Sequence, residues 1–266
     1  MPILIQNMKR QTMVCVVLPT YNNEETIVRA MDSVFQQDYD GKIILVVVPN
    51  GCTDKTEEKI QEYITEKEDW EQRRSDRIMV CNPYRGKGVV PSFNYGLECL
   101  QDELTRFKIP FGDIFVCRMD GDDAWHPNKI QKQIHFFEAN PEVDILGAQM
   151  RFVDPKTFVP MNIGYNYPLT DDEIKTDLFR GRNPIANPVA MYRWTVMDKA
   201  GRFEEIIPHA EDFWFWCKAA ITNHTFANLP DVLMDYSFEV KPHSNPNVGQ
   251  FVGQVAFALL QNKLQT

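Results

Sequence analysis

Short runs of apolar residues alternate with amphipathic segments along the first half of the chain. A continuous apolar run bounded by turn residues indicates a strand buried on both faces, whereas apolar residues three or four positions apart indicate a helix. The expected strands occupy residues 13–20, 42–50, 76–82 and 113–120. The expected helices occupy residues 23–37, 53–68, 90–104 and 127–140, with Thr53 as the candidate cap of the second. Strand–helix units in series predict an α/β fold with a mostly parallel central sheet and helices on both faces.

The second half of the chain is less regular. A strand with a bend is expected at 143–154, and a proline-rich, irregular stretch then runs to about residue 190. A helix begins the aromatic segment 209–221, and 229–238 is expected to be an edge strand. The amphipathic segment 249–264 predicts a closing helix. No repeat, low-complexity tract or linker divides these elements, so we expect one domain.

Composition excludes some classes of function. The chain carries 28 Lys and Arg against 37 Asp and Glu, a net charge of −9, which disfavours general binding to nucleic acid or to anionic membranes. The apolar runs are far too short to span a bilayer, and no signal-peptide pattern opens the chain. Six cysteines are scattered singly, without a CxxC pair. These features predict a cytoplasmic protein, and peripheral association with a membrane-bound partner stays open.

Polar clusters follow each of the four expected strands of the first half. They read PTYNNEE, PNGCTD, NPYRGKG and DGDD in chain order. The carboxyl ends of parallel strands meet at one edge of the sheet, and ligands of such folds bind in the crevice beyond that edge. We therefore expect the four clusters to form one site.

The DGDD cluster places Asp120, Asp122 and Asp123 together after a buried strand. Like charges raise each other's pKa values, and burial penalises the ionised forms, so the group needs a counter-charge. Oxygen ligands suit a hard divalent cation, Mg²⁺ or Mn²⁺, which would also let an acidic protein hold an anionic diphosphate. The alternative is a solvated turn that caps the helix beginning near Pro127, and Asp123 alone is readily explained as such a cap.

Two long segments carry a resemblance to a known family. VVLPTYNNEETIVRAMDSVFQQDY resembles the opening P-x-Y-N-x-E segment of glycosyltransferase family 2, and DIFVCRMDGDDAWHPNKIQKQIHFFEANPEVDILGA resembles its D-x-D-D stretch. The likeness covers about residues 13–240. It implies a Rossmann-like GT-A fold and transfer of a sugar, with inversion, from a nucleotide diphosphate sugar. It also implies a nucleotide-sugar-binding half at about 13–123, an acceptor-binding half at about 124–240 and a C-terminal helix at about 247–266, all within one domain over 1–266.

The resemblance assigns the donor's nucleotide to the first two loops. Pro19, Tyr21 and Glu24 would line the nucleotide pocket, with Tyr21 near the base. The family's second loop usually reads D-D-G-S-T-D, and its base-reading aspartate falls here on Asn50. An amide accepts a hydrogen bond from a base N–H but also donates one, so the donor can be of the UDP or the GDP type.

The same resemblance assigns the diphosphate and its metal. Asp120 would contact ribose and metal, and Asp122 would coordinate the Mn²⁺ or Mg²⁺ that bridges the diphosphate. Lys87 would contact the diphosphate or the donor sugar; a solvated loop is the alternative. His243, after the last strand, is a candidate metal ligand, with a looser alignment.

The segment AEDFWFW resembles the family's E-D-x-x-[LF]-W element. On that likeness Asp212 would be the general base, and Glu211 would orient Asp212 or the acceptor. The alternative is that both acids only favour a helix N-terminus. Trp214 and Trp216 could stack on a sugar, but residues two positions apart on a helix face different sides, so at least one belongs to the core.

Two other functions remain as alternatives to a metal-dependent hexosyltransferase. A nucleotidyltransferase of similar fold would also use paired aspartates, but it usually needs a glycine-rich basic loop after the first strand, which PTYNNEE lacks. A non-catalytic sugar-binding or scaffold protein is the other. The acceptor, whether glycan, lipid-linked or protein, is left undetermined, as is a homodimer.

Overall fold

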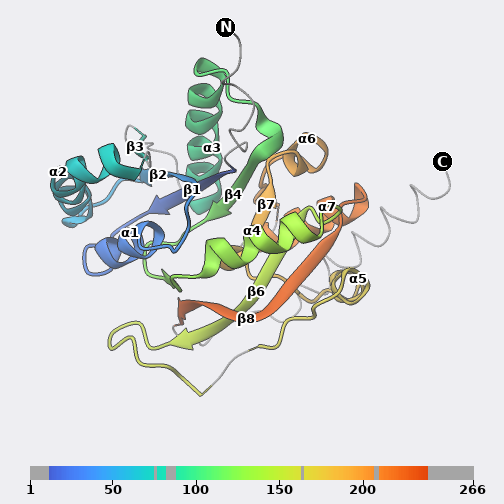
Figure 1. The fold of residues 1–266 in the computed structure, drawn as a ribbon. Coiled ribbons are helices and arrows are strands. Elements are labelled where there is room, and N and C mark those ends of the chain that lie inside the picture. The colour runs from blue at the N-terminus through green and yellow to red at the C-terminus, as the bar shows by residue number, and fades with distance from the viewer. Residues whose placement is uncertain (1–11, 75–76, 82–87, 163–164, 207–209, 239–266) are drawn as a thin grey trace, which may run out of the picture.

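The computed structural model describes residues 12–74, 77–81, 88–162, 165–206 and 210–238. Within these ranges, eight strands form one sheet in the order β3-β2-β1-β4-β7-β6-β8-β5 (Figure 1). The strands are β1 (Met13–Thr20), β2 (Lys42–Pro49), β3 (Arg77–Val80), β4 (Ile114–Arg118), β5 (Ala124–Trp125), β6 (Ile145–Val153), β7 (Met191–Arg193) and β8 (Phe226–Ser237).

The four strands of the first half pair in parallel, as their apolar runs predict. Every residue of β1 is buried, and β2 is buried from Ile43 onwards, because helices cover both faces. Beyond β4 the sheet becomes mixed: β7 is antiparallel to β4 and β6, while β6 and β8 pair in parallel with irregular register. The segment expected to be an edge strand forms β8, but β8 lies between β6 and the two-residue β5, so among the described residues β5 is the edge strand on that side.

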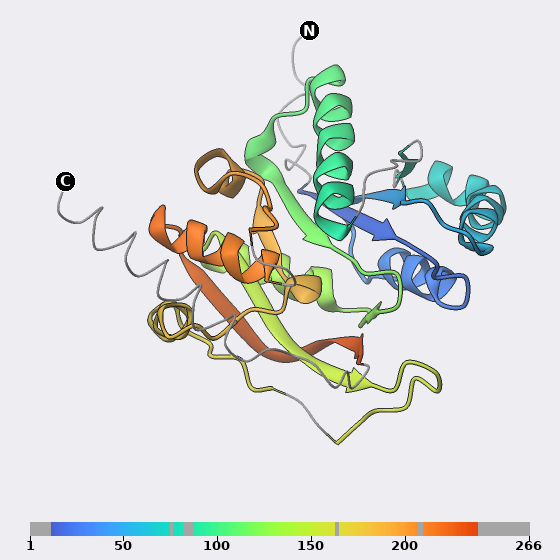
Figure 2. The same cartoon turned by 180° about the vertical axis from the view of Figure 1, so that it is seen from behind.

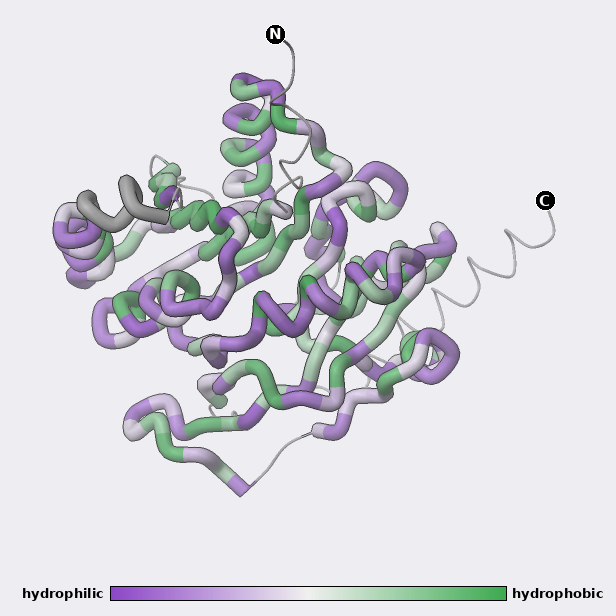
Figure 3. Tube along the Cα trace, in the orientation of Figure 1, coloured by the Kyte–Doolittle hydropathy of each residue, from purple (hydrophilic) through white to green (hydrophobic). Residues whose placement is uncertain are grey.

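Two layers of helices enclose the sheet, one in front in Figure 1 and the other in front in Figure 2. One layer contains α1 (Ile27–Phe35), α2 (Thr56–Arg74) and α4 (Lys129–Ala139). The other contains α3 (Val89–Arg106), α5 (Asp171–Phe179), α6 (Val196–Ala200) and α7 (Glu211–Ile221). Figure 3 shows hydrophobic and hydrophilic residues alternating along the helices, as one-sided burial requires.

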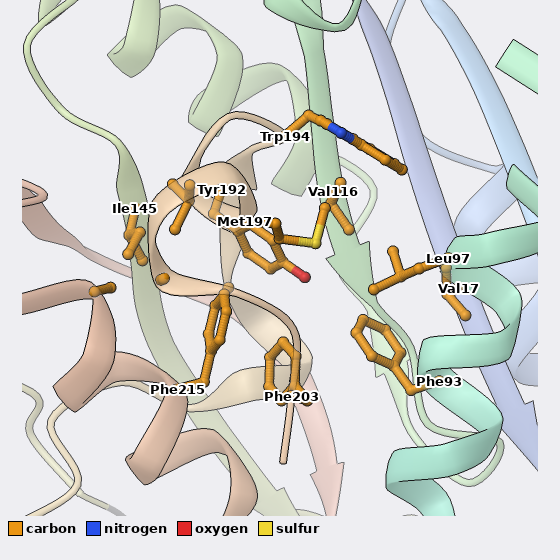
Figure 4. Close-up of a cluster of buried hydrophobic side chains, with 14 of the residues drawn as sticks. Val17, Phe93, Leu97, Val116, Ile145, Tyr192, Trp194, Met197, Phe203 and Phe215 are labelled. Atoms are coloured by element: carbon orange, nitrogen blue, oxygen red, sulfur yellow. The ribbon is translucent and has the colours of Figure 1, made fainter. Parts of the chain in front are cut away.

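An aromatic core fixes α7 against the sheet and against α3. Phe203 stacks on Phe215 with ring centroids 4.1 Å apart and meets Phe93 of α3 edge-on at 5.1 Å. Figure 4 shows these rings beside Val17 and Leu97. These ring contacts hold α7 in place, and so they also set the position of the acidic residues in its first turn relative to the ends of the strands.

The irregular stretch predicted for the second half contains structure that the apolar pattern did not indicate. It holds α5, whose first turn is closed by a capping box between Thr170 and Glu173, and then β7. The T-x-x-E spacing was a readable signal for α5. Helix α2 begins at Thr56 rather than at Thr53, because the Thr53 hydroxyl accepts from Asn22 Nδ2 (3.1 Å) and Asp54 Oδ1 accepts from the Thr56 N–H (3.0 Å).

The predicted closing helix at 249–264 lies outside the described residues. Among the helices that are described, none combines the length and the apolar composition needed to cross a bilayer.

Candidate active site at the carboxyl edge of the sheet

The loops after β1 and β2 are joined at the edge of the sheet. The N–H of Glu24 donates to Asp54 Oδ2 (3.1 Å), and the Glu24 carboxylate accepts from the Lys55 N–H (2.9 Å) just before α2. The Asn22 side chain joins the same loops through Thr53. Glu24 therefore links the two loops, and its carboxylate is already hydrogen-bonded to the backbone of the protein.

The nucleotide side of the edge holds the other residues predicted for it. Pro19 is buried near the end of β1, and the Tyr21 ring is 59% exposed, so its face is available to a ligand. The Asn50 amide nitrogen donates to Gly88 O (3.3 Å) and to Ser92 Oγ (2.6 Å). Because a carbonyl oxygen can only accept, the nitrogen must face Gly88, and Asn50 Oδ1 is directed away from it.

Asp120, Asp122 and Asp123, which we call the acidic turn, follow β4 directly. The Asp120 carboxylate accepts from Arg118 Nε (2.7 Å), and Arg118 Nη1 donates to Glu211 Oε1 (3.1 Å). Burial alone would lower the Arg118 pKa, but these two carboxylates raise it overall. One buried arginine thus connects the acidic turn to the first turn of α7.

Burial and mutual repulsion disfavour the ionised forms of Asp122 and Asp123 in the acidic turn. Burial, together with the neighbouring carboxylates, raises the pKa of Asp122 and raises that of Asp123 well above its ordinary value. Asp123 is 1% exposed; its Oδ1 accepts from the Ser237 N–H (2.8 Å), and within the described residues its Oδ2 is buried without a hydrogen-bond partner. The explanation of Asp123 as a cap is wrong, since α4 begins only at Lys129 and Asp123 is tied to the end of β8.

The acidic turn suits a divalent cation whose ligands come partly from the protein and partly from the substrate. Over the described part of the chain, no group of three or more His, Cys, Asp or Glu side chains could hold a metal on its own. Mg²⁺-type ions in phosphate-handling sites are typically held by one or two carboxylates plus substrate phosphates, and the turn offers Asp120 and Asp122. Lys87 and His243 lie outside the described residues, and His126 faces Asp235 (3.2 Å).

Asp212 lies apart from the acidic turn, in the first turn of α7. Its Oδ2 accepts from Asn183 Nδ2 (2.8 Å), and its Oδ1 accepts from the Phe213 N–H (2.7 Å). Burial and the adjacent charge of Glu211 raise the pKa of Asp212 to about 6, although both hydrogen bonds favour the carboxylate. The arrangement gives a fixed carboxylate that is ionised at neutral pH and still basic.

The two tryptophans of α7 are both part of the packing. Trp216 is buried completely, and Trp214 donates from its indole N–H to Glu204 Oε2 (2.9 Å) with only 9% of the residue exposed. Neither ring offers a face to a sugar.

Comparison with known proteins identifies the chain's relatives. The model of glycosyl transferase family 2 matches residues 15–199. The chain belongs to this family. The resemblance read from the sequence is therefore confirmed, and membership of the family supports glycosyltransferase activity as the broad function.

Curated relatives of this family-2 chain are distant. It is 26% identical over 237 residues to an uncharacterized glycosyltransferase of Haemophilus influenzae, which covers 86% of this chain and 66% of that protein. It is 25% identical over 224 residues to the amylovoran biosynthesis glycosyltransferase AmsE of Erwinia amylovora, covering 84% of this chain and 75% of that protein. The chain thus spans about two thirds to three quarters of these relatives' length.

Solved structures confirm the predicted GT-A fold. S. aureus TarS 1–349 in complex with UDP-GlcNAc is similar with a TM-score of 0.65 and 20% identity, over 94% of this chain and 67% of that one. The mannosyltransferase PcManGT of Pyrobaculum calidifontis, in complex with GDP-Man and Mn²⁺, is similar with a TM-score of 0.61 and 18% identity, over 95% of this chain and 70% of that one.

Three residues of the site were missed in the sequence. Arg118 had a signal, because a charged residue inside an apolar strand, two positions before Asp120, needs a partner. Arg29 of α1, which donates to the Asp122 carbonyl (3.0 Å), could have been suspected only with the helix face known. No sequence pattern pointed to Asn183, because it lies in a segment predicted to be irregular and contacts Asp212 only in the folded chain.

Proposed function

We propose that this family-2 enzyme transfers a sugar with inversion, using a divalent metal at the acidic turn and Asp212 as the general base. The observation that carries the proposal is the separation of the carboxylates into two groups. Asp120 and Asp122 share the turn after β4, whereas Asp212 stands on α7 with a pKa of about 6. Displacement at an anomeric carbon needs both: charge neutralisation at the leaving diphosphate and a base at the attacking hydroxyl.

Asp120 and Asp122 would hold the Mn²⁺ or Mg²⁺, which supplies Lewis-acid neutralisation of the diphosphate when bound. Arg118 keeps one oxygen of Asp120 engaged (2.7 Å) and so fixes the orientation of that carboxylate. Burial and the charge of Asp120 raise the pKa of Asp122, and a cation bound in this place would favour its ionised form.

Asp212 would accept the proton of the acceptor hydroxyl as that hydroxyl attacks. A positioned carboxylate base typically contributes about 10²–10⁴-fold to the rate. Asn183 and the Phe213 N–H hold its two oxygens, so the base keeps one orientation. Glu211 is a positioning residue, because its carboxylate accepts from Arg118 (3.1 Å) and adds the negative charge that makes Asp212 more basic.

The nucleotide would lie against Tyr21 and Pro19, with Asn50 Oδ1 accepting from an N–H of the base. The amide nitrogen of Asn50 is already engaged with Gly88 and Ser92, so the oxygen is the atom left for the base. Because TarS and PcManGT were solved with UDP-GlcNAc and GDP-Man, UDP- and GDP-hexoses are the donors to test first. Lys87 and His243 stay as predictions for the diphosphate and the metal.

Thermal denaturation with UDP-GlcNAc, GDP-mannose and related donors, with Mn²⁺ or EDTA, tests the proposal. A donor at 100 times its dissociation constant adds about 2.7 kcal/mol of stability, or roughly 5–10 °C for a chain of this size. We expect the shift to need Mn²⁺, to disappear in Asp122→Ala, and to survive in the control Asp102→Ala, an exposed acid on α3.

A second variant separates donor binding from catalysis. Asp212→Asn should keep the Mn²⁺-dependent shift but lose transfer by about 10²-fold or more. A metal-dependent shift that persists in Asp122→Ala would remove the acidic turn from the metal site. Absence of any shift would favour the scaffold alternative, and cleavage of a nucleoside triphosphate in its place would favour the nucleotidyltransferase.

A further inference from the structure

Five aromatic side chains gather where β6 and β8 end. Phe152 is buried and stacks on Phe238 with ring centroids 4.8 Å apart. Tyr236 approaches Phe152 at 5.7 Å and Tyr165 meets it edge-on at 5.8 Å. Tyr167 lies 6.2 Å from Tyr165. We call these five rings the aromatic platform: Phe152 and Phe238 form its base, and the three tyrosines carry hydroxyl groups.

The platform lies between the two groups of carboxylates that the proposed chemistry uses. Burial and then the charges of the acidic turn raise the pKa of Tyr236, so this ring adjoins the acidic turn. Asn228 Nδ2 donates to the Pro168 carbonyl (2.6 Å) and to the Pro184 carbonyl (2.9 Å), so the residue after Tyr167 lies near the residue after Asn183. Asn183 is the hydrogen-bond partner of Asp212 (2.8 Å), and after burial the charge of Asp212 raises the pKa of Tyr167. The chain itself makes the first link, since the residue after Tyr236 donates to Asp123 (2.8 Å). An acceptor hydroxyl must enter this same interval to reach both the base and the donor.

The platform is held firmly, yet part of it is open. The Gln149 side chain accepts from the Tyr167 N–H (2.8 Å) and donates to the Tyr167 carbonyl (3.1 Å), which fastens that segment to β6. Tyr165 is 66% exposed while resting on the buried ring of Phe152. Packing accounts for Phe152 but not for an exposed tyrosine supported by it. A rigid exposed aromatic face provides contact area at a low cost in side-chain entropy.

The charges around the platform discriminate among acceptor classes. Asp212 carries a negative charge that a metal at the acidic turn would not neutralise, and this charge repels a phosphate-bearing acceptor. Arg151 offsets this little, because its guanidinium makes two hydrogen bonds to the Asp235 carboxylate (2.6 and 2.8 Å). Arg29 faces the acidic turn, where it donates to the Asp122 carbonyl and lies over the Phe158 ring (3.7 Å). A pyranose presents an apolar C–H face to an aromatic ring and hydroxyls to tyrosine O–H groups, and it carries no charge.

We propose that the aromatic platform is the acceptor subsite and that the acceptor is an uncharged saccharide, which stacks on Tyr165 with a hydroxyl directed to Asp212. This inference rests on the proposed function, because it takes Asp212 as the base. It predicts that the phosphate of a polyprenyl phosphate is not the group to which the sugar is transferred.

The test is saccharide binding on an array of neutral oligosaccharides of glucose, galactose, mannose and N-acetylglucosamine, in the presence of UDP or GDP with Mn²⁺. Tyr165→Ala should weaken binding to the preferred saccharide by about two- to tenfold, as loss of one stacking contact implies. Tyr165→Phe should retain most of the affinity. Phe107→Ala removes an aromatic ring of similar exposure (50%) at the end of α3 and should change nothing. Melting temperatures of all variants verify that they fold.

Each outcome decides the inference. Binding that Tyr165→Ala weakens and Phe107→Ala preserves supports the platform. Equal binding by Tyr165→Ala, no binding to any neutral saccharide, or transfer to a polyprenyl phosphate or a serine peptide overturns it. The thermal shift with the donor, measured on the same samples, separates the two proposals. A Mn²⁺-dependent shift without saccharide binding would refute only the acceptor subsite. Absence of both the shift and saccharide binding would refute the proposed function as well.

Discussion

Replacing Asn183 by alanine tests whether the orientation and basicity of Asp212 are set across the irregular half of the chain. Asn183 Nδ2 donates to Asp212 Oδ2 at 2.8 Å, a bond that stabilises the ionised carboxylate and lowers its pKa against the opposing effects of burial and Glu211. A hydrogen bond to a charged group contributes about 1.5–3 kcal/mol, and 1.36 kcal/mol corresponds to one pKa unit. Its loss should therefore raise the pKa of Asp212 by about 1 to 2.

The sign of the effect follows from the role of Asp212. A base must be deprotonated, so kcat/KM falls as the pH drops through the folded pKa, which is about 6. In Asn183→Ala the midpoint of this acidic limb should move to roughly pH 7–8. At pH 6.5 the variant should lose most of its activity, whereas above pH 9 it should approach the wild-type rate, except for any loss from misorientation of the carboxylate.

The assay is the pH dependence of kcat/KM for sugar transfer, or of donor hydrolysis until an acceptor is identified. Arg182→Ala is the matched control, because Arg182 is next to Asn183 but its exposed guanidinium faces Asp177 (3.4 Å). An acidic limb that stays near pH 6 in an active Asn183→Ala enzyme would refute the reasoning, and so would an equal displacement in Arg182→Ala.

Three further changes probe stability. Arg118→Met leaves Asp120 and Glu211 without their counter-charge, and it should cost about 3 kcal/mol in chemical denaturation at pH 7; an unchanged midpoint would contradict the bridge. Asp212→Asn should raise the melting temperature by a few degrees at pH 8 but not at pH 4. A carboxyl group whose pKa is higher in the folded state destabilises the fold only above its pKa in the unfolded chain, near 4, and the full effect is present above its pKa in the folded state, about 6. Gly96→Ala would put a Cβ 2.5 Å from Val17 Cγ1 and should cost about 1–3 kcal/mol, whereas Gly112→Ala, with no atom within 4 Å, should be neutral.

Arg118 gives the site a physical coupling that the two motifs alone do not suggest. The D-x-D turn and the E-D element are 90 residues apart, yet one guanidinium accounts for an ion pair with each. Because the arginine is nearly buried, with 11% of its side chain exposed, solvent screens these pairs less than surface pairs.

The sequence by itself determined the parallel half of the fold and the family. Buried parallel strands are continuous apolar runs, and the helices between them have one apolar face, so both patterns can be read locally along residues 13–140. The carboxyl ends of such strands must share an edge, and the structure places the clusters around Asn50 and Asp120 at the same edge of the sheet. The elements of the second half could not be predicted from the apolar pattern because they are short: β7 has three residues and α6 five, too few to show a periodicity.

Only the tertiary structure decided which side chains meet. Glu24, assigned to the nucleotide, fastens the loop before α2; Asp123 joins the turn to β8; and Asn183 reaches Asp212 from 29 residues away. The physical reason is that hydrogen bonds and ion pairs act over about 3 Å and depend on direction, whereas a sequence pattern specifies only which face of an element is buried. The apolar pattern therefore specified the sheet edge, and packing of the two helical layers selected the contacts made there.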